Sequence, residues 1–363
     1  MSDQLDNLIM AGGTGGHIFP GLALARELQA RGESVAWLGS RNSMEARQIP
    51  ATGIDFYALS ISGLRGKGKL ALLLAPLRLL WALLQAWRLL RRLRPARVIG
   101  FGGFASGPGG LAAYWLGIPL YIHEQNALPG MTNRRLSQVA QRVFTAFPSA
   151  FADLDKVVCV GNPVRADLCQ LAEPQQRYQE RSGPLRVLVV GGSLGAQVLN
   201  ERLPQALASL PPELRPQVWH QAGAGKEAST LQAYQELLGD SMNGVQVSAF
   251  IEEMASAYAW ADLVICRAGA LTISELAVVG VAAVLVPFPF AVDDHQTYNA
   301  RFLAESGAAI LLPQPELTVE GLAELVCDHP GYRQELAKRA AAARQLARPQ
   351  ATADLALALL KDE

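Results

Sequence analysis

The feature that most constrains the fold is a glycine-rich turn that follows a short apolar run in each half of the chain. Leu5–Ala11 leads into Gly12–Gly16 (GGTGG), and Leu185–Val190 leads into Gly191–Gly195 (GGSLG). A helical pattern follows each turn, so the order is strand, glycine turn and helix. Backbone amides in such a turn can approach an anion or a sugar oxygen closely. The repetition predicts two Rossmann-like domains of similar design.

Other apolar runs that read as strands alternate with helical patterns along the chain. Their ranges are 34–39, 55–60, 97–101, 119–123 and 142–146 in the first half, and 217–222, 244–250, 262–266 and 282–286 in the second. Such alternation predicts an α/β protein with doubly wound parallel sheets. The length of 363 residues predicts two domains. We expect them at residues 1–163 and 185–363, joined by a linker at 164–184, with the last helix packing back on the first domain.

Charge and cysteines narrow the class of protein. Residues 1–163 contain 17 Lys and Arg against 9 Asp and Glu, a net charge of +8, and the rest of the chain has a net charge of −8. This asymmetry predicts that the first half faces something anionic. The four cysteines form no CxxC pair, which argues against a disulfide scaffold or a zinc site and favours a reducing cytoplasm. No basic stretch followed by an apolar core opens the sequence, so we expect no signal peptide.

The first glycine turn differs from a dinucleotide-binding fingerprint. Ile18 stands where the third glycine is required, and Leu38-Gly39-Ser40 ends the second strand without an acid to hold a ribose. His17 lies at the start of the next helix, where the positive end of the helix dipole disfavours imidazolium. His17 is therefore a candidate general base. A histidine that is only hydrogen-bonded within the turn explains its position equally well.

Residues 65–97 form a basic and apolar segment with nine Lys or Arg and no acid. Residues 70–90 approach the length of a membrane span, but Arg78, Arg88 and Pro76 argue against one. Leu and Trp occur on nearly every helical face, which predicts a helix lying in a membrane interface and attracted by anionic lipid. A core helix of the first domain is the alternative. The expected membrane contacts are Leu74, Leu77, Trp81, Arg88, Arg91 and Arg92.

Polar residues also follow the fifth expected strand, as His123-Glu124-Gln125-Asn126. In a doubly wound sheet the carboxyl ends of the strands form the ligand crevice, so a ligand explains this cluster better than a core does. Glu124 is the second candidate for the general base.

The stretch Cys266–Ala300 carries polar residues after two neighbouring expected strands. Glu275 could accept both hydroxyls of a ribose, but Thr272-Ile273-Ser274-Glu275 also has the pattern of a helix capping box. Gln296 and Asn299 suit hydroxyl recognition, or belong to an ordinary polar loop. Asp293 and Asp294 have no further ligands nearby in sequence and are weak evidence for a metal.

A different class of enzyme is also compatible with the second glycine turn. GGSLG fits the G-x-S-x-G nucleophile elbow of α/β hydrolases, and Ser193, Asp262 and His295 follow the chain order of their triads. Against this, the first turn has the same design without a serine. Ser193 and the following amides would equally hold a diphosphate at a helix start.

Several longer motifs, taken together, resemble one family. The chain is similar to the MurG family of UDP-N-acetylglucosamine transferases, which make lipid II from lipid I in peptidoglycan synthesis, through the motifs GGTGGHIFPG, ISGLRGKG, GFGGFASGPGGLAA, HEQN, GNPVR, GGSLGA, CRAGALTISELA and QTYNA. The motifs cover nearly the whole chain in order. The resemblance implies a GT-B fold, with two Rossmann-like domains and the active site in the cleft between them.

The resemblance also implies roles for single residues. Thr14, Gly15 and Gly16 would lie against the sugar and acceptor, and Asn126 and Arg165 would line the cleft. Ser193 would contact the diphosphate, while Phe250 and the Ile251 backbone would frame the uracil. The donor would also contact Ala270, Leu271, Thr272, Ile273, Ser274 and Glu275, and Glu275 would take the ribose hydroxyls. Gln296, with Asn299, would read the GlcNAc hydroxyls; the alignment of Gln296 requires a one-residue gap.

The implied reaction is an inverting displacement at C1 of GlcNAc by the C4 hydroxyl of MurNAc in lipid I. The partners implied are UDP-GlcNAc, undecaprenyl-linked lipid I and anionic lipid at the cytoplasmic face of the membrane, with the protein bound peripherally. No nucleic acid and no particular protein partner is indicated. Helix amides near Ser193, with Arg165, can stabilise the leaving diphosphate, so we expect no cofactor and no essential metal. A UDP-GlcNAc epimerase or another GT-B enzyme with a soluble substrate is the alternative, against which residues 65–97 argue.

Overall fold

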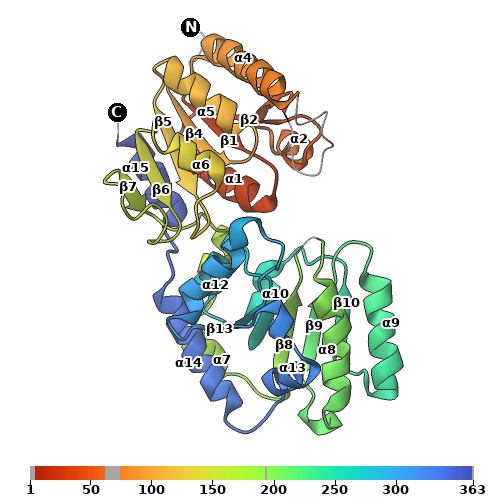
Figure 1. The fold of residues 1–363 in the computed structure, drawn as a ribbon. Helices are drawn as coiled ribbons and strands as arrows, with labels where there is room; N and C mark the ends of the chain where they lie inside the picture. The colour runs from red at the N-terminus through yellow and green to blue at the C-terminus, as the bar shows by residue number, and fades with distance from the viewer. Residues whose placement is uncertain (1–4, 62–73, 193, 362–363) are drawn as a thin grey trace. The chain divides into compact units, whose positions relative to one another are not determined.

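The computed structural model of the chain describes residues 5–61, 74–192 and 194–361 (Figure 1). The chain divides into two compact units. The first unit comprises Met1–Val164 together with Pro349–Glu363, and the second comprises Arg165–Arg348. Each unit is built around a parallel sheet with helices on both faces.

The first unit contains a seven-stranded sheet in the order β3-β2-β1-β4-β5-β6-β7. Every strand pair in it is parallel, and β1 lies between β2 and β4. The central strands are fully buried because helices cover both faces, which is why they read as continuous apolar runs. The strands are β1 (Asn7–Ala11), β2 (Val35–Ser40), β3 (Asp55–Leu59), β4 (Arg97–Gly102), β5 (Leu120–Glu124), β6 (Arg142–Thr145) and β7 (Val157–Cys159).

The two faces of this sheet have separate cores. Ile9 of β1 packs with residues of α1 and of the last helix, whereas Leu8 and Met10 pack with residues of α4 and α5 on the other face. Alternate residues of a strand point to opposite faces, so one apolar strand serves both cores. The helices are α1 (Gly15–Ala30), α2 (Met44–Gln48), α4 (Ala75–Leu93), α5 (Ser106–Trp115), α6 (Met131–Leu136) and α15 (Ala351–Leu360), with the 3-10 turn η1 (Pro50–Thr52).

The second unit contains a six-stranded parallel sheet in the order β10-β9-β8-β11-β12-β13. Its centre pairs β8 with β9 and β11, in register at Val187, Val218 and Leu263. The strands are β8 (Arg186–Val190), β9 (Gln217–Gln221), β10 (Val245–Ser248), β11 (Leu263–Cys266), β12 (Ala282–Leu285) and β13 (Ala309–Leu311).

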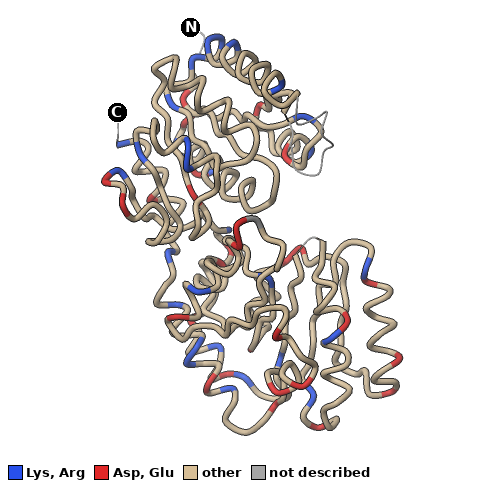
Figure 2. Tube along the Cα trace, in the orientation of Figure 1, with Lys and Arg blue, Asp and Glu red and all other residues tan. Residues whose placement is uncertain are grey.

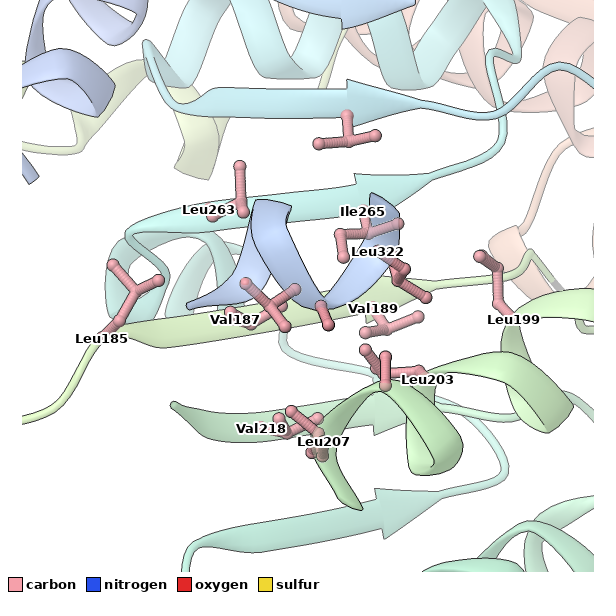
Figure 3. Packing of buried hydrophobic residues seen from close by; sticks show 14 of the residues in the cluster. Leu185, Val187, Val189, Leu199, Leu203, Leu207, Val218, Leu263, Ile265 and Leu322 are labelled. Carbon is pink, nitrogen blue, oxygen red and sulfur yellow. The ribbon is translucent and has the colours of Figure 1, made fainter. Parts of the chain in front are cut away.

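Leucines spaced along α8 fill one face of this second sheet. Leu199, Leu203 and Leu207 pack in one cluster with Val187 and Val189 of β8 and Val218 of β9 (Figure 3). Their spacing of four places all three on one side of the helix. The helices are α7 (Pro174–Gln179), α8 (Gln197–Ser209), α9 (Glu227–Leu238), α10 (Met254–Trp260), α11 (Ala270–Val279), α12 (His295–Ala304), α13 (Val319–Val326) and α14 (Tyr332–Gln345). The 3-10 turns are η2 (Ala166–Gln170), η3 (Pro212–Leu214), η4 (Gly239–Ser241), η5 (Val292–Asp294) and η6 (Gln314–Glu316).

The expected linker at 164–184 is instead a folded part of the second unit. It forms η2 and α7, and Tyr178 is buried in the core of that unit. The Tyr178 hydroxyl donates to the backbone oxygen of Asp262, and Arg177 Nη2 donates to the backbone oxygens of Val279 and Gly280. These long-range bonds fix a segment whose polar composition resembled a linker. The last helix, α15, packs against α1 in the first unit, as expected.

Candidate active site

The first glycine turn is shaped by a close approach of two backbones. A Cβ atom on Gly103 would lie 2.4 Å from the Gly12 backbone oxygen, and Gly103 has a positive φ of 88°. Only glycine therefore allows the turn after β4 to pack on the turn after β1. Thr14 is the N-cap of α1 but makes no side-chain capping bond, so Gly15 and Gly16 begin the helix with amides that no side chain caps.

His17 is held in the first turn of α1 by its own glycine turn. Its Nδ1 lies 3.0 Å from the backbone oxygen of Gly12. A carbonyl oxygen can only accept, so Nδ1 carries the proton and Nε2 is the basic nitrogen of the neutral ring. A Cβ on Gly102 would lie 3.3 Å from Nε2, so this glycine keeps room beside the basic atom. His17 is therefore hydrogen-bonded within the turn, as one interpretation of the sequence expected. The same bond selects the tautomer that a general base needs, so it is compatible with the other interpretation as well.

Glu45, which the sequence analysis did not single out, supports the same turn. It lies on the short helix α2 and is fully buried. One carboxylate oxygen accepts from the Ser40 amide at 3.0 Å, and the other accepts from the Gly13 amide at 3.2 Å. The carboxylate therefore joins the end of β2 to the glycine turn.

Glu124, the second candidate base, holds together the loop that follows β5. Its carboxylate accepts from the backbone amides of Asn126 and Gly130 and from the side-chain amides of Asn126 and Asn133, at 2.9–3.2 Å. The residue is buried. A carboxylate with four donors is arranged to accept bonds from the protein, which favours a positioning role for Glu124.

His123 has a structural role in the core of the first unit. Burial lowers its pKa to about 4, so the ring stays neutral. Nε2 lies 2.9 Å from the Gly161 backbone oxygen, and Gln125 Nε2 lies 3.1 Å from Nδ1. With Glu124, three of the four polar residues in this motif therefore build the loop from inside the protein.

The second glycine turn also rests on a close backbone approach. A Cβ on Gly195 would lie 1.9 Å from the Ala222 oxygen, and one on Gly223 would lie 2.3 Å from the Gly195 amide. Helix α8 begins at Gln197, two residues after Gly195. Ser193 lies outside the described residues, so its contact with a diphosphate stays a prediction.

Helix α11 offers an uncapped amino end at the carboxyl edge of the second sheet. Its N-cap is Gly269, and no side chain caps it. Ala270, Leu271 and Thr272 form its first turn, so their amides and the helix dipole can receive an anion. Ile273 is buried, and the Ser274 hydroxyl donates to the Ala270 oxygen.

The capping box expected at Thr272–Glu275 is absent from this helix start. The helix begins at Ala270, two residues before Thr272, so Glu275 lies in the second turn. From there a carboxylate cannot reach back to an N-cap amide. This removes the structural explanation that competed with a ligand role for Glu275.

Glu275 is a buried carboxylate with few partners. Its Oε2 accepts from the Tyr258 hydroxyl at 3.1 Å, and its Oε1 lies 3.9 Å from Arg165 Nε. Burial raises its pKa to about 7, although Arg165 and the Tyr258 hydroxyl act in the opposite direction. Perturbed carboxylates of this kind are typical of functional sites.

Gln296 and Asn299 anchor the loops at this edge. Gln296 Oε1 accepts from the amides of Ala268 and Phe288 at 3.2 and 2.9 Å, which leaves its amide nitrogen as the group suited to a sugar hydroxyl. Asn299 is fully buried and its Nδ2 donates to the Ala268 oxygen. The expectation that Asn299 reads a hydroxyl directly conflicts with this burial, because a group inside the core supports the turn from behind.

Phe250 and Ile251 follow β10 at the same edge of the second sheet. Phe250 is 60% exposed, whereas Ile251 is buried. An exposed ring beside a fixed backbone is the arrangement that a flat base requires for stacking and edge recognition.

The hydrolase triad is not formed. Asp262 precedes β11, where it pairs with Arg181 Nε at 3.1 Å and Arg333 Nη2 at 3.3 Å. His295 follows the carboxyl ends of the strands, because it begins α12 after β12. Asp262 and His295 therefore lie at opposite ends of the sheet, and no Asp–His pair can form.

Helix α4 has one buried stripe and a wide exposed apolar surface. Ala82, Ala86 and Leu90 face the core, whereas Leu77 is 64% and Trp81 is 50% exposed. Leu74, Leu79, Leu80 and Leu84 are exposed as well. Of the basic and apolar segment 65–97, residues 65–73 lie outside the described residues.

Basic residues flank this apolar surface, and the helix carries no acid (Figure 2). Arg88, Arg91 and Arg92 are exposed, and Arg91 stacks over Trp87 at 4.8 Å. Tyr114 and Trp115 end α5 and are also exposed, which no feature of the sequence had indicated. Helix α5 packs against α4.

The described residues also bear on metal binding and on membrane spanning. No three or more His, Cys, Asp or Glu side chains there are grouped so that they could hold a metal ion. Within the same residues, the helices all fall short of the length and apolar character needed to cross a membrane.

Comparison with known proteins gives matches over nearly the whole chain. The Glycosyltransferase family 28 N-terminal domain matches residues 8–145, and the Glycosyltransferase family 28 C-terminal domain matches residues 186–355. Two relatives named UDP-N-acetylglucosamine–N-acetylmuramyl-(pentapeptide) pyrophosphoryl-undecaprenol N-acetylglucosamine transferase are similar to it. The relative from Marinobacter nauticus is 56% identical, over 95% of this chain and 94% of its own length. That from Neisseria meningitidis is 53% identical, over 97% of both.

Solved structures agree with these matches. The crystal structure of Acinetobacter baumannii MurG superposes with a TM-score of 0.83 at 43% identity, covering 98% of this chain and 99% of that one. The glycosyltransferase of kitacinnamycin superposes with a TM-score of 0.68 at 18% identity and covers 98% of each chain, which shows a shared fold.

Proposed function

The chain belongs to glycosyltransferase family 28, and we propose that it transfers N-acetylglucosamine from UDP-N-acetylglucosamine to lipid I, giving lipid II for peptidoglycan synthesis. The observation that carries the proposal is the similarity along the full chain to relatives whose names state this transfer. The acceptor group is the C4 hydroxyl of the MurNAc residue. The arrangement of the described residues supports a division of work between the two units.

The second unit is proposed to bind the donor. The uncapped start of α11 suits the diphosphate, and Glu275 is a buried acceptor for the ribose hydroxyls. Phe250 and the Ile251 backbone suit the uracil, and the Gln296 amide nitrogen suits a GlcNAc hydroxyl. Ser193 is proposed to contact the diphosphate, as the family motif implies.

The first unit is proposed to activate the acceptor through His17. As the acceptor oxygen forms its bond to C1 of GlcNAc, its proton moves to His17 Nε2. The bond from C1 to the diphosphate oxygen breaks, and UDP leaves with that electron pair. Attack on the face opposite the leaving group inverts the configuration at C1. The bond from Nδ1 to the Gly12 oxygen supports this step, because it keeps Nε2 as the basic nitrogen.

We propose that the reaction needs no metal ion. Charge on the leaving diphosphate would be met by the amides at the start of α11, the second glycine turn and Arg165. Transfer should therefore persist in a chelator. Loss of activity in the chelator that is restored by magnesium would overturn this part of the proposal.

We propose that α4 holds the enzyme at the cytoplasmic face of the membrane. Its exposed leucines and Trp81 would enter the interface, and its arginines would attract anionic lipid. Replacing Leu77 and Trp81 by Asp should abolish co-sedimentation with anionic vesicles while transfer to a water-soluble acceptor continues. Arg26→Asp, on α1, is the matched control for added negative charge. Equal co-sedimentation of the unaltered protein, the double Asp variant and Arg26→Asp with the vesicles would contradict the proposal.

The decisive experiment measures transfer of radiolabelled GlcNAc from UDP-GlcNAc to a lipid I analogue, with and without chelator. Labelled lipid II is the expected product. UDP-GlcNAc binding without transfer, together with epimerised sugar, would favour an epimerase instead. Absence of both transfer and UDP binding would overturn the function altogether.

A further inference from the structure

Glu45 is a buried carboxylate that lies one peptide unit away from His17. The Gly13 amide donates to Glu45 Oε2 at 3.2 Å. The nitrogen of Gly13 and the carbonyl of Gly12 belong to the same planar peptide unit. That carbonyl oxygen accepts from His17 Nδ1 at 3.0 Å. A continuous path therefore runs from carboxylate through peptide to imidazole.

The surrounding sequence makes room for this carboxylate. A Cβ on Gly12 would lie 2.3 Å from Glu45 Oε1, and a Cβ on Gly39 would lie 2.7 Å from Glu45 Cγ. Glycine thus stands on both sides of the Glu45 side chain, at the ends of two strands. Burying a carboxylate is costly unless donors compensate it, and here the Ser40 and Gly13 amides do so. A side chain that only filled this space could be apolar, so the charge calls for another explanation.

We propose that Glu45 is a positioning residue for the reaction, and that it acts on His17 through the Gly12–Gly13 peptide unit. The inference rests on the proposed role of His17 as general base. A carboxylate on the N–H side polarises the peptide and makes its carbonyl oxygen a stronger acceptor. This strengthens the Nδ1–H bond, most of all when His17 has taken the acceptor proton and become imidazolium. In a Ser-His-Asp triad the carboxylate bonds directly to the histidine, fixes its tautomer and stabilises the imidazolium. Here we expect Glu45 to have the same effect through the intervening peptide unit.

The test replaces Glu45 by Gln, which keeps the size of the side chain and removes its charge. The Gln amide nitrogen must then face one of two N–H donors, so the link to Gly13 is weakened. We expect kcat to fall on the order of tenfold, the lower end of what supporting hydrogen-bond partners contribute, with KM for UDP-GlcNAc unchanged. The ring nitrogens of His17, observed by ¹⁵N NMR, should show a lower titration midpoint and a smaller share of the Nδ1–H tautomer.

Glu33→Gln is the matched control in the same unit. Glu33 accepts from Asn7 Nδ2 and pairs with Arg97 Nη2, both at 3.0 Å, and these contacts do not involve the glycine turn. This variant should lower the melting temperature without moving the His17 signals. If Glu45→Gln behaves like Glu33→Gln, Glu45 is only structural and the proposal is wrong.

Two further measurements keep the outcomes distinct. In the unaltered protein the Gly13 amide shift should follow the His17 titration more strongly than the Ser40 amide shift does, so the proposal can be tested even if Glu45→Gln does not fold. Equal or absent responses would overturn it. Full activity of His17→Ala would instead show that His17 is not the base. The effect of Glu45→Gln on the His17 signals could still be measured in protein that retains His17.

Discussion

The two glycine turns occupy the same place in two sheets of the same design, but they are held differently. In the first unit, α1 begins within the turn, and the turn is fixed by a side chain, Glu45, and by His17. Both turns rest on a close backbone approach, but in the second unit the side chain that bonds to the turn is the neutral Gln221, whose Nε2 donates to the Gly192 oxygen at 3.2 Å, and α8 begins only at Gln197.

This difference shows how one local fold can serve two kinds of chemistry. A turn fastened by a carboxylate and an imidazole holds a titratable group at a defined atom. The second turn, GGSLG, contains no titratable residue, and its backbone amides suit an anion. The first turn is therefore suited to moving a proton, and the second to binding a charged donor.

The largest effect expected from this comparison follows removal of the imidazole. His17→Ala should lower kcat by about 10²- to 10⁴-fold, the usual contribution of a general base. UDP-GlcNAc affinity, measured by calorimetry, should be unchanged because the proposed donor site lies in the other unit. His329→Gln, an exposed residue of the second unit, is the control. A loss of donor affinity in His17→Ala would contradict the assignment of proton transfer to the first turn and donor binding to the second.

The second turn should be sensitive to added volume. Gly195→Ala places a Cβ 1.9 Å from the Ala222 oxygen at a φ of 70°. We expect the free energy of unfolding of the second unit to fall by roughly 3 kcal/mol or more, and UDP binding to weaken. Gly225→Ala is the control, because Gly225 has a φ of 74° but no atom within 4 Å of the added Cβ. Equal melting temperatures for the two variants would show that the backbone packing is unimportant.

The first turn should show a kinetic effect at Gly102. Gly102→Ala adds a Cβ 3.3 Å from His17 Nε2 at a φ of 98°. Displacement of the basic nitrogen should lower kcat by about 10- to 100-fold, since small misplacements of reacting groups are costly. Gly117→Ala carries a similar φ penalty away from His17 and should keep its kcat. Identical kcat values in both variants would argue against His17 as the base.

The smallest effect expected concerns the pH dependence of donor binding. In the proposed donor site, ribose hydroxyls would donate to the ionised form of Glu275, whose pKa is raised to about 7. Protonation removes that acceptor, so affinity should fall as the pH drops, by about tenfold between about pH 8 and about pH 6. Glu275→Gln should bind more weakly and lose this dependence. A dependence that persists in Glu275→Gln would assign it to another group.

The sheets were predictable from sequence because parallel strands are buried on both faces and read as apolar runs. Strand β13 was missed, since Ala309–Leu311 is only three residues long and follows Gly307-Ala308 without a marked pattern. The segment 164–184 was misread because its polar composition hides the long-range bonds of Arg177 and Tyr178. The composition of a segment predicts only its average exposure. It does not show that single residues within the segment are buried and bonded to distant parts of the chain.

The position of His17 at a helix start was predictable, because a glycine turn follows β1 and leads into α1. The roles of His17 and Gln296 stay predictions. Glu275 was expected in the first helical turn, because the pattern T-x-x-E matched a capping box that the start at Ala270 rules out. Glu45 was not found at all. A glutamate on a five-residue helix is usually exposed, and only the fold shows that it accepts from Gly13.

The position of α15 has a consequence for biosynthesis. Leu355, Ala356 and Leu359 complete the core beneath α1, and the Leu359 oxygen accepts from Arg97 Nη1 at 2.9 Å. The first unit is thus assembled from both ends of the polypeptide, whereas Arg165–Arg348 is continuous. On the ribosome we expect the usual amino-to-carboxyl order of domain folding to be reversed. The middle of the chain would become protease-resistant first, and a nascent chain stalled before Pro349 would still be cleaved within residues 5–164.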